Sequence, residues 1–149
     1  MSNIASDLYA KDQLYTFSLR RLGFLLVAII MFVTSEYATS VYRATVYQQQ
    51  IADWGLADVS GNLLGVIALN YLFLFLVHAD WSRGCLWIGG TSLGMIVYEF
   101  IQPMFPWGTF DYLDIAATII GAVVSLVIFS GLQLLPGPEY HHKAQKIAS

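Results

Sequence analysis

The chain has 149 residues, of which 57% are hydrophobic and only 11% are charged. A soluble domain carries about 25% charged residues, so this composition indicates a protein that is solvated by lipid. The formal net charge of -3 offers no cationic stripe and argues against a nucleic-acid partner. The single cysteine, Cys85, excludes an internal disulfide and a multi-cysteine metal site.

Four apolar stretches are long enough to cross a membrane, because a helical span needs roughly 20 apolar residues. In chain order they cover Leu19–Tyr42, Asp58–His78, Cys85–Met104 and Tyr112–Leu135. The sequence therefore predicts an all-α, polytopic membrane protein with four transmembrane helices. We divide it into a cytoplasmic or interfacial N-terminal segment (1–18), a four-helix transmembrane domain (19–135) and a cytoplasmic tail (136–149).

The basic residues predict how these helices are oriented. Most of them flank the same side of the four spans, namely Lys11, Arg20, Arg21, Arg83, Lys143 and Lys146. Arg43 alone falls on the other side. Since cytoplasmic segments of membrane proteins are enriched in Lys and Arg, we expect both termini to be cytoplasmic. The connections at 43–57 and 105–111 are then expected to be loops that face outward.

The two halves of the chain contain a similar pattern. Residues 54–65 and 107–121 both have Trp-Gly and, further on, Asp-x-x-x-(Asn/Thr)-x-x-Gly at the start of a membrane helix. The helix before each pattern carries one glutamate, Glu36 or Glu99. We therefore expect two duplicated helical hairpins, an arrangement that often brings a site between the repeats. Both patterns are short, so a chance similarity is the alternative.

Glu36 and Glu99 lie inside predicted helices, where an acidic side chain costs about 3 kcal/mol on insertion scales. Both are therefore expected to face the bundle interior or a wet cleft. Gln102 lies three residues after Glu99 and shares its helix face. Arg43 is the natural counter-ion, as the one basic residue on the outer side. The alternative role for the glutamates is a polar network that merely holds helices together.

Three aspartates on the same side have a simpler interpretation. Asp111 and Asp114 resemble a capping pair for the fourth helix, and Asp58 is placed to cap the second. Together with the residues above they make a candidate ligand-binding cluster: Glu36, Arg43, Asp58, Glu99, Gln102, Asp111 and Asp114. No cofactor or metal is expected, because His141-His142 in the tail supplies only two ligands.

A known family has a signature similar to residues 99–121. The matching residues are Glu99-x-x-Gln102, Pro106-x-Gly108-x-Phe110-Asp111-x-x-Asp114 and Gly121. This pattern resembles that of VanZ-like membrane proteins, named after a teicoplanin-resistance protein, and the likeness is sharpest over residues 94–129. The family's arginine in the turn is missing here, and its asparagine is Thr118. The resemblance implies a bacterial inner-membrane protein with an envelope-related role and no known reaction.

Three functions remain open. The first is binding or handling of an envelope lipid or other amphipathic molecule in an outward-facing acidic cleft. The second is a non-catalytic accessory subunit, with other membrane chains or a second copy as partners. The third is a proton-coupled transporter, because carboxylates at membrane depth relay protons. An enzyme is not the expected function, since the sequence has no Ser-His-Asp set, no H-E-x-x-H and no phosphate-binding glycine loop.

Overall fold

The computed structural model describes residues 18–77, 79–106 and 108–135, which are helical apart from the short connections between helices. The elements in order are α2 (Leu19–Tyr37), the π-helix η1 (Ala38–Tyr42), α3 (Arg43–Gln49), α4 (Leu56–Val77), α5 (Trp81–Ile101), the 3-10 helix η2 (Gln102–Met104) and α6 (Tyr112–Leu132). Four segments are long and apolar enough to span a membrane. The predicted all-α fold with four such helices is confirmed for this part of the chain. The predicted N-terminal segment up to residue 17, the tail from 136, His78 and Trp107 lie outside the described residues.

The first spanning helix is longer than the sequence predicted. It runs through α2, η1 and α3 without a break and covers 31 residues, Leu19–Gln49. The predicted loop from residue 43 is therefore wrong for its first seven residues, because 43–49 contain no glycine or proline that would end a helix. The helix ends at Gln49, and its C-cap, Gln50, has a left-handed φ of 51°. At 1.5 Å per residue the helix is about 46 Å long, well beyond a hydrocarbon core of roughly 30 Å.

The third spanning helix starts four residues before its predicted boundary. Asp80 is its N-cap, and the Asp80 carboxylate accepts a hydrogen bond of 2.8 Å from the backbone N–H of Arg83. This cap adds Trp81–Gly84 to the predicted apolar stretch, which began at Cys85. At the same end of the bundle, α6 ends at Leu132 rather than at Leu135. Shifts of this size are usual, because caps rather than hydrophobicity fix helix ends.

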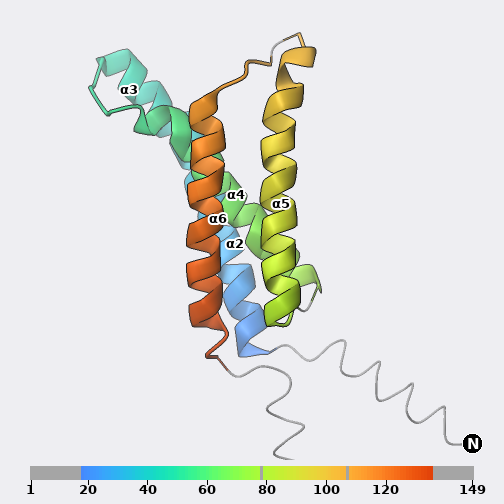
Figure 1. The fold of residues 1–149 in the computed structure, drawn as a ribbon. Coiled ribbons are helices and arrows are strands. Elements are labelled where there is room, and N and C mark those ends of the chain that lie inside the picture. Colours follow the sequence, from blue (N-terminus) through green and yellow to red (C-terminus); the bar gives the residue numbers. More distant parts are fainter. Residues whose placement is uncertain (1–17, 78, 107, 136–149) are drawn as a thin grey trace, which may run out of the picture.

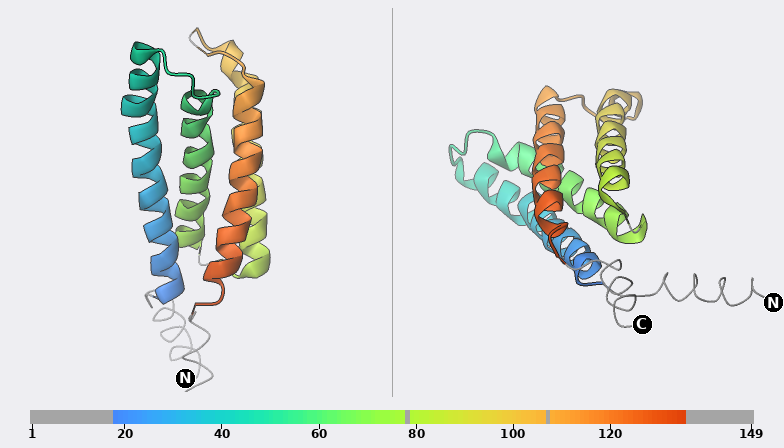
Figure 2. Two further views of the ribbon diagram at one scale, coloured as in Figure 1. Left: turned by 90° about the vertical axis from the view of Figure 1, so that its left-hand side faces the viewer. Right: turned by 60° about the horizontal axis from the view of Figure 1, so that its bottom comes forward.

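The helices form two antiparallel pairs, α2 with α4 and α5 with α6, and the first pair crosses the second obliquely (Figure 1). α4 contacts each of the other three spanning helices, whereas α2 touches α6 only weakly. The chain enters α2 and leaves α6 at the same end of the bundle, which we call the lower end (Figure 2). The upper end contains α3, the start of α4, the end of α5 and the start of α6.

An aromatic cluster joins the helices at the lower end. The buried Phe24 ring of α2 lies 6.0 Å from Tyr71 of α4 and 5.7 Å from Phe129 of α6, measured between ring centroids. Phe129 also stacks on Trp81 of α5, at 5.4 Å. The Tyr71 hydroxyl donates a 2.8 Å hydrogen bond to the Ser125 carbonyl oxygen. All four spanning helices therefore meet around Phe24 and Phe129.

Two arginines at the start of α2 hold the ends of neighbouring helices. The Arg20 guanidinium donates to the carbonyl oxygens of Gln133 and Leu135, at 3.1 Å each, just after α6. Arg21 donates to the Phe75 carbonyl at 3.1 Å, in the last turns of α4, and its guanidinium carbon lies 4.7 Å from the centre of the Phe75 ring. Cations favour helix C-termini, whose last carbonyl groups lack partners within the helix.

Small residues let α4 approach its neighbours higher in the bundle. Ser35 of α2 donates a 3.0 Å hydrogen bond to the Gly61 carbonyl of α4. On the opposite side of α4, a Cβ added to Gly121 of α6 would lie 2.3 Å from Cγ1 of Val66 and 2.9 Å from the Leu63 carbonyl oxygen. Such close approach of backbones is the usual basis of helix packing in membranes. The α4–α6 contact therefore requires glycine at position 121.

Gly121→Ala is expected to destabilise the protein by about 1–3 kcal/mol, because the added methyl group overpacks the α4–α6 contact. The measurement is thermal or denaturant unfolding of the full chain in detergent. Gly89→Ala is the matched control, since nothing lies within 4 Å of a Cβ added to this α5 glycine. Equal stabilities of the two variants would contradict the close α4–α6 packing.

Candidate functional site

Glu99 is a buried carboxylate near the upper end of α5. Its side chain is 1% exposed, and among the described residues Oε2 has no hydrogen-bond partner. The inward face of α5 contains Gly84, Ile88, Ser92 and Glu99, at helical spacing. Helical periodicity therefore brings this carboxylate into the bundle, where an unpaired charge is costly. The prediction that Glu99 faces the interior is confirmed.

Two aspartates at the start of α6 lie next to Glu99. Asp111 is the N-cap of α6 and accepts a 2.8 Å hydrogen bond from the backbone N–H of Leu113, which confirms its predicted capping role. Asp114 is in the first turn, where the Asn62 side chain of α4 interacts with it. Both aspartates are close enough to act electrostatically on Glu99. We call Glu99, Asp111 and Asp114 the upper carboxylate cluster.

A tight turn after α5 positions this cluster. The Gln102 carbonyl oxygen accepts a 2.9 Å hydrogen bond from the Phe105 N–H, and the Phe105 carbonyl accepts one of 3.1 Å from the Gly108 N–H. A Cβ added to Gly108 would lie only 1.8 Å from the Gln102 carbonyl oxygen. The Gln102 backbone thus takes part in folding the chain back so that α6 starts beside the end of α5.

Arg43 of α3 pairs with Asp58 in the first turn of α4. Nη2 of Arg43 lies 3.2 Å from Oδ1 of Asp58, and the Tyr47 hydroxyl donates a 2.6 Å hydrogen bond to the same oxygen. Arg43 is also close enough to act on Asp114. The predicted counter-ion therefore does reach the acidic residues. Its direct ion pair is with Asp58, and because both side chains are half-exposed this pair contributes little to stability.

Asp53, which the sequence analysis missed, caps α4 in place of Asp58. The Asp53 carboxylate accepts hydrogen bonds from the backbone N–H groups of Ala57, at 2.6 Å, and Gly55, at 3.1 Å. It also accepts one of 3.3 Å from the Tyr42 hydroxyl of η1. The expected capping by Asp58 is wrong because α4 starts at Leu56 and Asp58 is already inside its first turn. The sequence feature that indicated this cap is the position of Asp53, three residues before Leu56, the first apolar residue of α4.

Glu36 lies apart from the upper carboxylate cluster. It is exposed on α2, and it is not among the residues that act electrostatically on Glu99 or Asp114. Its side chain makes no ion pair or hydrogen bond with another described residue. The two glutamates that matched in the predicted repeat therefore occupy different environments, one exposed and one buried.

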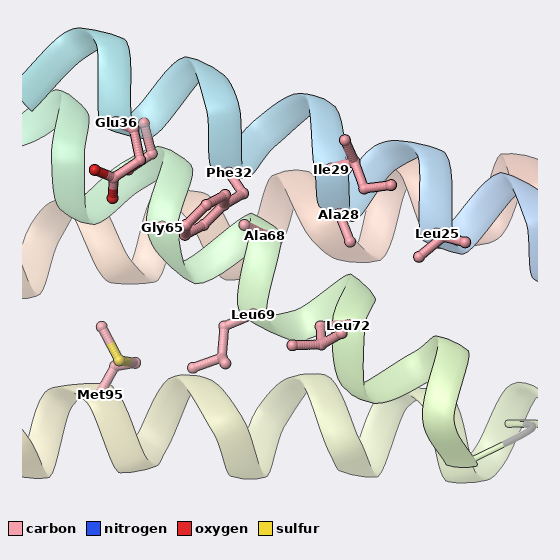
Figure 3. Close-up of a pocket in the computed structure, with 11 residues that line it drawn as sticks. Leu25, Ala28, Ile29, Phe32, Glu36, Gly65, Ala68, Leu69, Leu72 and Met95 are labelled. Atoms are coloured by element: carbon pink, nitrogen blue, oxygen red, sulfur yellow. The ribbon is translucent and has the colours of Figure 1, made fainter.

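Glu36 borders an apolar groove between α2, α4 and α5, with a volume of about 520 Å³ (Figure 3). Among the residues that line the groove, Glu36 alone is charged. Most of the others are apolar and include Leu25, Ile29, Phe32, Leu69, Leu72 and Met95. Ser35, the other residue with a hydrophilic side chain, already donates its hydroxyl to Gly61. The groove thus combines an apolar wall with one carboxylate at its upper end.

A polar network in the middle of the bundle, rather than the two glutamates, holds the helices together through hydrogen bonds. Asn70 of α4 is fully buried and donates hydrogen bonds to Ser92 of α5, at 3.3 Å, and Ser125 of α6, at 3.1 Å. Ser125 donates in turn to the Gly121 carbonyl at 2.8 Å. Interhelical hydrogen bonds of this kind contribute about 1 kcal/mol each in membranes.

No protein-family model, curated protein or solved structure matches the chain. Within the part of the chain that the structure describes, no group of three or more His, Cys, Asp or Glu side chains is arranged to hold a metal ion. The features that indicate a function are therefore the carboxylates, the apolar groove and the charges at the two ends of the bundle.

Asp53→Ala is expected to lower the free energy of unfolding by about 1 kcal/mol or more, because it removes a helix cap. Asp58→Ala is the matched comparison and should cost less, since it breaks a half-exposed ion pair. Both are measured by unfolding of the full chain in the same detergent. A larger effect for Asp58→Ala would show that the capping residue is misassigned.

Proposed function

We propose that this protein binds an amphipathic envelope lipid in the groove between α2, α4 and α5, with Glu36 holding a positively charged headgroup. The observation that carries the proposal is the combination of an apolar wall and a single carboxylate without a described partner at its upper end. Ligand sites are usually mostly apolar, with a few polar groups that orient the ligand.

The dimensions of the groove support an acyl chain as its occupant. From Leu25 to Glu36 it follows α2 for 11 residues, or about 16 Å at 1.5 Å per residue. This length is about half of a roughly 30 Å hydrocarbon core, which corresponds to one leaflet. The volume of about 520 Å³ also falls within the usual range of ligand pockets, about 300–1,000 Å³.

The charge of the groove supports an amino headgroup. An acidic side chain near the hydrocarbon is costly unless a cation lies beside it. Among the described residues none supplies that cation to Glu36, since Arg43 pairs with Asp58. A lipid ammonium group would supply it and form a charge-assisted hydrogen bond. Phosphatidylethanolamine has this chemistry, whereas phosphatidylglycerol lacks the cation.

The direction of the groove follows from a proposed orientation, in which the lower end faces the cytoplasm. Arg20, Arg21 and Arg83 all belong to the lower end, whereas Arg43 belongs to the upper end. The positive-inside rule favours the cytoplasm for the arginine-rich end. The lipid headgroup at Glu36 would then lie toward the outer leaflet. The resemblance to VanZ-like proteins of the bacterial inner membrane supports this envelope-facing role.

A second candidate function is an accessory subunit of a larger membrane complex. The favouring observation is the upper part of the 31-residue first helix. It is longer than a membrane span requires, and α3 stands away from α5 and α6 (Figure 1). Several of its side chains are exposed, including Val41 and Tyr47. A partner chain that packs on α3 would use this exposed surface.

The lipid proposal is tested by native mass spectrometry of the full chain, released from bilayers of phosphatidylethanolamine and phosphatidylglycerol with matched acyl chains. We expect one phosphatidylethanolamine to be retained selectively. Glu36→Gln should reduce that selectivity roughly tenfold or more, the equivalent of one charge-assisted hydrogen bond. Leu69→Trp should reduce retention of both lipids, because the larger side chain fills the groove.

Asp80→Asn is the matched control, because it also neutralises one carboxylate but at the lower end, and asparagine still caps a helix. It should retain lipid as the wild type does. Equal retention of both lipids by the wild type, or full retention by Glu36→Gln, would overturn the lipid proposal. Stable co-purification of another chain at fixed stoichiometry, lost when α3 is altered, would favour the subunit.

The orientation is tested by labelling introduced cysteines in intact cells with a membrane-impermeant maleimide. Cys85→Ser removes the single native thiol and gives the background. We expect Gln48→Cys, in α3, to react in intact cells, because it would face outward. Ser82→Cys, at the lower end, should react only after the membrane is opened. The reverse pattern would show that the lower end faces outward.

A further inference from the structure

A second polar site lies at the upper end of the bundle, where α5 ends and α6 starts. Glu99 is 1% exposed and its Oε2 has no hydrogen-bond partner among the described residues. Asp111 and Asp114 act electrostatically on it from the start of α6. Because Glu36 is not part of this group, the site is independent of the lipid proposal.

Thr118 of α6 is a second buried residue with an unpaired side-chain oxygen. It lies four residues after Asp114, one turn further down α6, and therefore on the same helix face. Its side chain is fully buried, and Oγ1 also has no hydrogen-bond partner among the described residues. Buried polar groups are nearly always paired, with protein groups, water or a ligand. Asp114 links the two unpaired oxygens, because it acts on Glu99 and lies one helical turn from Thr118. Together they point to an occupant that this chain does not itself supply.

The charge of the surroundings decides what the occupant is. The upper carboxylate cluster is joined by Asp58, which acts on Asp114 together with Arg43. Arg43 is the single basic residue at the upper end within the described segments, and it is already paired with Asp58. Carboxylate and hydroxyl oxygens are acceptors that suit hard cations and ammonium groups. An anion is excluded by the surplus of negative charge.

The arrangement of the cluster favours a cation of single charge. No group of three or more His, Cys, Asp or Glu side chains in the described part of the chain is arranged to hold a metal ion. The cluster therefore does not supply the six to eight oxygen ligands that a divalent ion such as Ca²⁺ takes. We propose that Glu99, Asp114 and Thr118 bind a monovalent cation, either an alkali ion or the primary ammonium group of an amine. An alkali ion and an ammonium group each carry one positive charge. The carboxylates would neutralise this charge, and the neutral Thr118 oxygen would complete the binding site.

The cation reaches this site from the upper end of the bundle. Asp111 lies in the connection before α6 and is partly exposed, Asp114 is partly exposed in the first turn, and Glu99 is buried. Two partly exposed aspartates thus lie beside the buried Glu99. Asp111 attracts the cation, while Glu99 and Thr118 hold it out of water.

The test uses the full chain in a neutral detergent, with a bulky organic cation keeping the ionic strength constant. Sodium, potassium and methylammonium are titrated separately, and the unfolding temperature is followed by intrinsic fluorescence. We expect at least one of them to raise the unfolding temperature saturably. Saturation by sodium or potassium identifies an alkali-ion site, and saturation by methylammonium alone identifies an amine site.

Variants connect this response to the residues. Glu99→Gln should abolish the saturable shift, and Asp114→Asn should weaken the apparent Kd at least tenfold. Thr118→Val should weaken it several-fold, and it keeps the test decisive if Glu99→Gln does not fold. Asp80→Asn, at the lower end, should respond as the wild type does. No saturable shift in the wild type, or a wild-type response from both Glu99→Gln and Thr118→Val, would overturn the proposal.

Discussion

The aromatic contact between Phe24 and Phe129 is the constraint on which the rest of the arrangement depends. It joins the first helix to the last, while Tyr71 and Trp81 bring the two middle helices to the same place. The two hairpins are joined at the lower end and cross obliquely. At the upper end α3 therefore stands away from α5 and α6 (Figure 1). The groove lies between α2, α4 and α5, and the carboxylate cluster lies where α5 ends and α6 starts.

The bundle separates its polar groups into structural and available ones. Asn70 uses its amide to join three helices, and Ser35 and Ser125 donate to backbone carbonyls, so these side chains serve packing. Asn70 leaves only its Oδ1 unpaired, whereas the buried side chains of Glu99 and Thr118 make no hydrogen bond with another described residue. In lipid, where water does not compensate a missing partner, this difference is the strongest physical distinction between a structural residue and a candidate site residue.

The two glutamates show why a sequence repeat does not fix a shared environment. Glu36 and Glu99 occupy equivalent positions in the proposed duplication, yet Glu99 faces inward and Glu36 faces the groove. The reason is the asymmetric packing, in which α4 contacts three helices whereas α2 has α4 as its main neighbour. The duplication itself stays a prediction, because Trp107, one half of its Trp-Gly signature, lies outside the described residues.

Composition and run length alone determined that the chain is helical, has four helices long and apolar enough to span a membrane, and has acidic residues at one end, because a bilayer demands long apolar helices. Local sequence also identified Asp111 as a cap, since capping acts over three residues. Tertiary structure decided the rest. Whether Asp53 or Asp58 capped α4, which carboxylate Arg43 paired with, and which glutamate was buried all depend on how neighbouring helices pack, and that information is not local in the sequence.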